Sequence, residues 1–166
     1  MHSTDLLTDG FHRVHDGVTA LLDGTEPGDL DRRPGGDANP VGWLLWHLLR
    51  VQDDHVSEVA GQQQVWPEGW SRRAGLPLDE ADTGYGHDRA QVDAVRVDAD
   101  LLRGYAEAVH ARTVRALEEL SDADLDRVVD DSYDPPVTVG VRLVSVLEDD
   151  LQHLGQAAYA LGQLRA

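Results

Sequence analysis

Trp43-Leu44-Leu45-Trp46-His47-Leu48-Leu49 is an apolar run interrupted by one polar side chain, His47. Asn39-Pro40 precedes it, and this pair predicts a helix start because asparagine caps a first turn and proline fits the first helical position. The helical pattern continues to Val59 and stops at Gly61. Apolar side chains surround almost the whole helix, which indicates a helix buried among other helices.

Three further segments repeat apolar residues at spacings of three and four, the helical period. They span residues 3–22, 95–120 and 138–164. Residues 62–94 are rich in proline and glycine and form a crossover far longer than the usual connection of about 2–8 residues between bundle helices. Strand signals are short, at residues 128–129 and 137–139. We therefore expect one all-α domain over residues 1–166, a four-helix bundle with a long crossover between its second and third helices.

Composition excludes several classes of function. The 166 residues carry a formal net charge of −17, and every basic residue is an arginine. This charge argues against binding to nucleic acid or to an anionic membrane. Cysteine is absent, which excludes disulfides, thiolate metal ligands and a cysteine nucleophile. Residues 1–5 lack the basic start of a signal peptide, and no apolar run is long enough to span a bilayer, so we expect a cytoplasmic protein.

Asp149 and His153 lie four residues apart in the last predicted helix. This spacing places both side chains on one face, about 6 Å apart at their β-carbons, where they can bind one cation. His47 needs partners for two ring nitrogens inside its apolar helix, and a metal would satisfy one of them. Three protein ligands would leave an open coordination position, as in catalytic sites. Asp150 competes with Asp149 as the carboxylate ligand.

Simpler interpretations remain open for the same residues. Asp149 and His153 could form an acid–histidine pair on the surface. His47 could be a core histidine that bonds to a backbone carbonyl. The remaining candidates are weaker: Asp54 lies about 10.5 Å along the helix axis from His47, and His55 lies further still. The other histidines have no partner at a metal-binding spacing; they are His2, His12, His15, His87 and His110.

The Trp43-x-x-x-His47 stretch and His153-Leu154-Gly155-Gln156 resemble the corresponding segments of the DinB-like superfamily of metal-binding four-helix bundles. That superfamily usually carries His-x-x-x-His-x-Gly-Gln in its last helix, and here Asp149 replaces the first of these histidines. The replacement resembles the branch of mycothiol-dependent maleylpyruvate isomerase and mycothiol transferases. The resemblance implies His47, Asp149 and His153 as metal ligands.

The same resemblance implies a transferase or isomerase-like enzyme in which a divalent metal activates a thiol for attack on a small electrophile. Zinc is the expected metal, with nickel, iron or manganese as alternatives, mycothiol or a similar thiol is the expected cosubstrate, and a homodimer is the expected assembly. No catalytic residue beyond the metal centre is expected. The alternatives are a non-catalytic, stress-associated metal-binding protein and a purely structural helical dimer. Five side chains are weaker candidates for substrate contacts: Arg50, Arg142, Gln156, Trp66 and Trp70.

Overall fold

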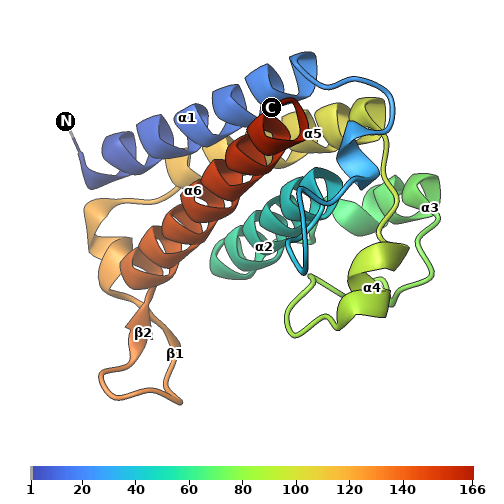
Figure 1. The fold of residues 1–166 in the computed structure, drawn as a ribbon. Coiled ribbons are helices and arrows are strands. Elements are labelled where there is room, and N and C mark those ends of the chain that lie inside the picture. The colour runs from blue at the N-terminus through green and yellow to red at the C-terminus, as the bar shows by residue number, and fades with distance from the viewer. Residues whose placement is uncertain (1) are drawn as a thin grey trace.

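Within residues 2–166, the part of the chain that the computed structural model describes, four long helices form the bundle (Figure 1). Met1 lies outside this range, so the expectation drawn from residues 1–5 falls partly outside it. The long helices are α1 (Ser3–Asp23), α2 (Val41–Ala60), α5 (Ala99–Glu118) and α6 (Val139–Leu164). The short elements are η1 (Asp29–Asp31), η2 (Trp66–Glu68), α3 (Trp70–Ala74), α4 (Arg89–Ala94), η3 (Asp122–Asp126), β1 (Val128–Asp130) and β2 (Val137–Thr138). The predicted fold class is confirmed.

The four long helices pack as a ring in which α1 contacts α5 and α6, and α2 contacts the same two helices (Figure 1). Helix α2 buries sixteen of its twenty residues. This agrees with its nearly continuous apolar sequence, because a helix with apolar side chains on every face has to be covered on every face. The α2–α6 seam is the most extensive contact in the molecule, and it places the two candidate ligand segments side by side.

The start of α2 differs in detail from the prediction. Pro40, with extended backbone, is the residue before the first helical turn, and Asn39 makes no cap. A close backbone approach lies at this end of the helix. A β-carbon on Gly42 would lie 2.9 Å from the carbonyl oxygen of Leu30 in η1, so glycine is required where η1 crosses α2.

The third long helix begins at Ala99, four residues later than predicted. The side chain of Asp98 accepts a hydrogen bond of 2.7 Å from the backbone N–H of Leu101 and so fixes the helix start. Val95 and Val97 are buried in the extended segment before it, which explains why their apolar pattern looked helical. The crossover itself contains α3 and α4, short helices that the glycines and prolines of this region concealed.

The two weak strand signals pair with each other. β1 and β2 form a two-stranded antiparallel sheet that projects from the bundle at the start of α6 (Figure 1). The hydroxyl of Thr138 then accepts a hydrogen bond from the N–H of Val141 and begins α6 directly after the strand. Along the described chain, none of the helices combines the length and the apolar character needed to cross a bilayer.

Candidate metal centre

His47, Asp149 and His153 converge at the α2–α6 seam. Each offers one ligand atom, and these three atoms lie within 4.8 Å of one another. The two imidazole rings meet edge to face, with centroids 4.7 Å apart, and His153 Nε2 lies 3.5 Å from Asp149 Oδ1. His47 is buried at 3% exposure, whereas the side chains of Asp149 and His153 retain 24% and 18%. The group is therefore buried at His47 and open to solvent on the side of Asp149 and His153.

Both histidines are held in the orientation that metal-binding histidines adopt. His47 Nδ1 lies 2.5 Å from the carbonyl oxygen of Thr83, and His153 Nδ1 lies 3.1 Å from Oε1 of Gln156. Each oxygen is an acceptor, so each Nδ1 carries the proton and donates it. The Nε2 atoms are then the free ligand positions, and an N–H···O bond on the opposite nitrogen is what fixes them.

The electrostatics of the group also suit a cation. Burial lowers the pKa of His47, which keeps that imidazole neutral. The contact with Asp149 raises the pKa of His153, so a divalent ion at this pair would compete with a proton on His153. Asp149 Oδ2 is buried and has no hydrogen-bond partner among residues 2–166. A buried carboxylate oxygen without a partner is costly, and a cation would satisfy it, so the donor set fits a divalent metal.

Of the two neighbouring aspartates, Asp149 is the one that converges with the histidines. Asp150 is fully buried, and neither of its carboxyl oxygens has a partner in the described chain. Burial and the neighbouring Asp149 raise the pKa of Asp150 well above its usual range, which disfavours its charged form.

The crossover supports the centre in a way that sequence analysis missed. His87 Nε2 donates to Asp82 Oδ1 at 2.9 Å, and His87 Nδ1 accepts a bond of 3.1 Å from the indole N–H of Trp43. The Trp43 ring stacks on His47 with centroids 4.7 Å apart and an angle of 13° between the planes. The crossover therefore fixes His47 in two ways. The carbonyl of Thr83 bonds to its Nδ1, and His87 bonds to Trp43, whose ring stacks on the imidazole. Only the four-residue spacing of Trp43 and His47 signalled any of this in the sequence.

Two of the expected substrate contacts lie in the core. Arg50 is fully buried and its guanidinium contacts Asp53 Oδ2 at 3.4 Å and the Tyr105 hydroxyl at 3.2 Å. Trp66 is buried at 3% exposure beneath the same guanidinium, whose carbon lies 5.3 Å from the centre of its ring. Trp70 is half-buried and packs on Tyr105. In this arrangement Arg50 and Trp66 attach the crossover to the bundle.

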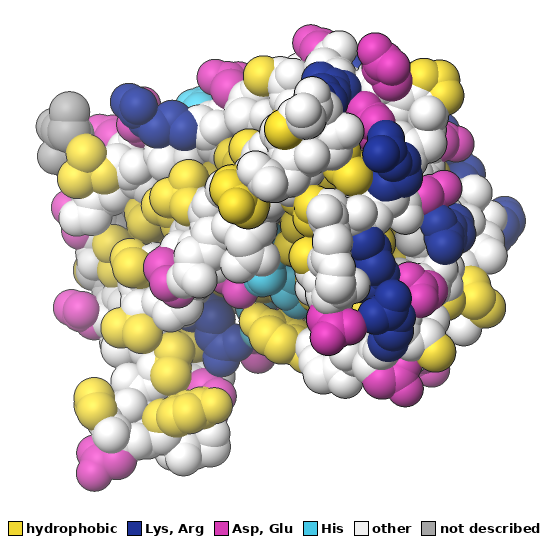
Figure 2. Space-filling model, in the orientation of Figure 1, with side chains coloured by type: hydrophobic (Ala, Val, Ile, Leu, Met, Phe, Trp, Pro, Cys, Tyr) yellow, Lys and Arg dark blue, Asp and Glu magenta, His cyan; other side chains and the backbone are white. Residues whose placement is uncertain are grey.

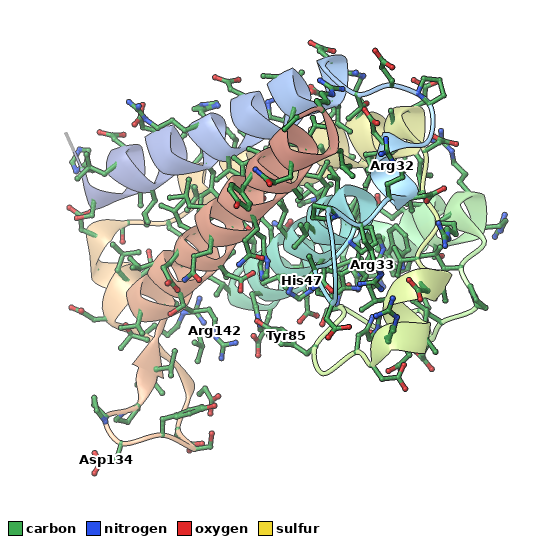
Figure 3. The ribbon with its side chains drawn as sticks, in the orientation of Figure 1. Arg32, Arg33, His47, Tyr85, Asp134 and Arg142 are labelled. Carbon is green, nitrogen blue, oxygen red and sulfur yellow. The ribbon has the colours of Figure 1, made fainter. Side chains whose placement is uncertain are left out.

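Gln156 and Arg142 lie at the open side. Gln156 is exposed and contacts His153 as described above. Figure 3 shows Arg142 and Tyr85 on the same side of the bundle as His47, and Figure 2 shows histidine side chains in a recess near the middle of that face. Arg142 donates to His55 Nδ1 at 2.9 Å and lies 3.6 Å from Glu58 and 3.5 Å from Asp130. Tyr85 is 63% exposed and meets the His47 ring edge-on at 5.4 Å.

Comparison with known proteins agrees with this arrangement. The family model of the DinB superfamily matches residues 11–157, a range that includes all three converging side chains. The chain belongs to the DinB superfamily. A solved structure described as the conserved protein of locus from Enterococcus faecalis superposes with a TM-score of 0.91 at 28% sequence identity, covering 98% of this chain and 97% of that one. Among curated proteins, none matches the sequence significantly.

Proposed function

We propose that this DinB-superfamily protein is a metal-dependent enzyme whose ion is held by His47, Asp149 and His153. The observation that carries the proposal is the convergence of one ligand atom from each of two imidazoles and one carboxylate, while both Nδ1 atoms contact oxygen acceptors. Three ligands leave room for one more group from solution, the arrangement of catalytic rather than structural sites. Zinc suits this donor set, and nickel, iron or manganese would also bind two imidazoles and a carboxylate.

The reaction we propose is transfer or isomerisation through a low-molecular-weight thiol that attacks a small electrophile. When bound, a divalent ion lowers the pKa of a thiol and so supplies thiolate near neutral pH. The protein has no cysteine of its own, so the thiol has to be a cosubstrate. Mycothiol is the candidate suggested by the acidic residue at position 149.

The residues around the centre have separate tasks in this proposal. His47 and His153 stay oriented because Thr83 and Gln156 hold their Nδ1 protons. Tyr85, exposed and in edge-on contact with His47, gives a substrate an apolar surface with a phenolic hydroxyl. The Arg142 guanidinium, on the same side of the bundle as His47, is a cation for an anionic substrate group, and Glu58 and Asp130 already neutralise part of its charge.

A thiol-consumption assay tests this function. Tag-free protein is loaded with zinc, nickel or manganese and assayed with mycothiol and a panel of electrophiles. We expect turnover that His47→Ala abolishes and that His2→Ala, a histidine at the far end of α1, leaves intact. Metal binding without turnover would instead support a non-catalytic metal-binding protein. Turnover that survives in His47→Ala would refute the proposed role of the centre.

We further propose a homodimer in the cytoplasm. The outer face of α6 exposes Val144 at 58%, Leu151 at 48% and Tyr159 at 70%, and apolar side chains that repeat along one helix face favour contact with a second protein surface. Light scattering after size-exclusion chromatography tests the dimer. A mass of about 36 kDa, twice the 18.2 kDa chain, would support it, and a monomer at micromolar concentration would refute it.

A further inference from the structure

Three histidines meet on the seam between α1 and α5, which shares no helix with the seam that carries the metal centre. α1 contributes His12 and His15, and α5 contributes His110. His110 Nε2 lies 2.9 Å from His12 Nδ1. The His15 ring stacks on the other side of His110, with centroids 4.3 Å apart and an angle of 18° between the planes. Imidazoles that are 98 residues apart in the sequence are thus in direct contact.

The histidine nitrogens of this cluster bond to one another and to a nearby carboxylate, and one buried nitrogen is left over. His15 Nε2 lies 3.0 Å from Glu107 Oε2, and its Nδ1 lies 3.7 Å from Asp16. His110 Nδ1 is buried and has no partner within residues 2–166. Buried polar atoms that lack partners are rare in folded proteins and call for an explanation.

A transition-metal ion would fit the facing nitrogens His110 Nε2 and His12 Nδ1, and it would leave the buried His110 Nδ1 of the same ring as it is. Two imidazole nitrogens on one tetrahedral zinc ion lie about 3.3 Å apart, given bond lengths near 2.0–2.1 Å. The pair formed by His12 and His110 is already within a few tenths of an ångström of that separation. His12 and Glu107 are exposed, so their side chains can turn toward an ion without disturbing the core.

The surroundings also favour a cation. His12 lines a surface groove of about 910 Å³ between the start of α1 and the end of α5. The groove also carries the carboxylates of Asp5, Asp9 and Asp122, and a cleft with charges of one sign concentrates ions of the opposite sign. This groove gives an ion a route to the exposed side of His12.

We propose that His12, His15 and His110, with the carboxylate of Glu107, form a second binding site for a divalent transition-metal ion, independent of the centre on α2 and α6. Imidazole ligands favour zinc, nickel and copper over magnesium and calcium. The first contacts are His12 and His110, and His15 completes the site by turning out of its stack on His110 together with its partner Glu107.

Zinc titration of a protein that lacks the first centre tests this inference. The parent for the experiment is tag-free, metal-free His47→Ala/His153→Ala, studied by isothermal titration calorimetry. We expect it to bind one equivalent of Zn²⁺. Adding His110→Ala should remove this binding, and adding His15→Ala should weaken it roughly tenfold or more. Adding His55→Ala, a histidine outside both the cluster and its groove, should leave it unchanged.

Circular dichroism and thermal unfolding of each variant show whether the helices remain formed, and only folded variants are compared. Electron paramagnetic resonance of the Cu²⁺-loaded parent gives a second readout, because nitrogen ligands split the copper signal and we expect fewer of them after His12→Ala. A parent that binds no zinc would overturn the inference, and so would a folded His110→Ala variant that binds as tightly as the parent. Either failure would leave the centre formed by His47, Asp149 and His153 untouched, since both of its histidines are already absent.

Discussion

Replacing Gly84 by alanine should damage the metal centre without touching any ligand. Gly84 has a φ of +97°, a backbone conformation that costs an L-residue about 1–2 kcal/mol. The added β-carbon would lie 2.7 Å from His47 Nδ1, 3.1 Å from Trp46 and 3.2 Å from Trp43. Favourable carbon contacts lie at about 3.5–4.0 Å, so the crossover or the imidazole has to move by roughly 1 Å. Either movement breaks the bond from His47 Nδ1 to Thr83.

Gly86→Ala is the matched control. Gly86 has a φ of +70°, and its added β-carbon would meet nothing within 4 Å. Both variants should therefore lose about 1–2 kcal/mol in urea unfolding from the backbone cost, with a further loss only in Gly84→Ala. Zinc affinity by calorimetry should fall about 10–100-fold in Gly84→Ala, the usual effect of disturbing the hydrogen bond behind a ligating histidine, and stay constant in Gly86→Ala. Equal zinc affinity in the two variants would refute the claim that the crossover positions His47.

Three further substitutions test neighbouring features. Asp53→Ala leaves the fully buried Arg50 without its carboxylate and should cost about 3–5 kcal/mol in urea unfolding, whereas a loss below 1 kcal/mol would contradict the buried ion pair. Burial, reinforced by Asp53, raises the pKa of Tyr105 well above its usual value of 10. The unfolded chain therefore loses this proton first as pH rises, and the stability that Tyr105 contributes is complete below pH 10 and declines above it. Tyr105→Phe should accordingly flatten the fall of unfolding free energy between about pH 9 and 11, and an unchanged slope would show that another group is responsible. Gln156→Ala frees His153 Nδ1 at an exposed position, so zinc affinity should fall about tenfold with no change in thermal stability, and unchanged affinity would remove Gln156 from the centre.

Local patterns predicted the bundle because the spacing of apolar residues in each long segment indicates which face of that helix is buried. The apolar run around His47 requires a helix covered on all sides, and the structure buries α2 between α5 and α6. The four-residue spacing of Asp149 and His153 likewise fixes their relation within one helix. Once α2 and α6 pack against each other, His47 comes close to Asp149 and His153 without any further requirement on the sequence.

The rest of the site depends on contacts that no local pattern encodes. Thr83 acts through its backbone carbonyl, which any residue would provide, and Gly84 matters because of the space it leaves beside His47. Arg50 was expected at the substrate because a guanidinium can recognise the carboxylates of a thiol or substrate. Its burial depends on Asp53, which also accepts the backbone N–H groups of residues 65 and 66 and so ties the crossover down. Such a network appears only when the crossover has been placed.

Anomalous diffraction at the zinc edge, from crystals of the tag-free protein grown with zinc, tests the central claim most directly. The account predicts a peak about 2.0–2.2 Å from Nε2 of His47, Nε2 of His153 and the carboxylate of Asp149. The Nδ1 atoms should remain bonded to Thr83 and Gln156, and the fourth position should be open to solvent. Crystals in which zinc binds elsewhere, while these three side chains point apart, would contradict it.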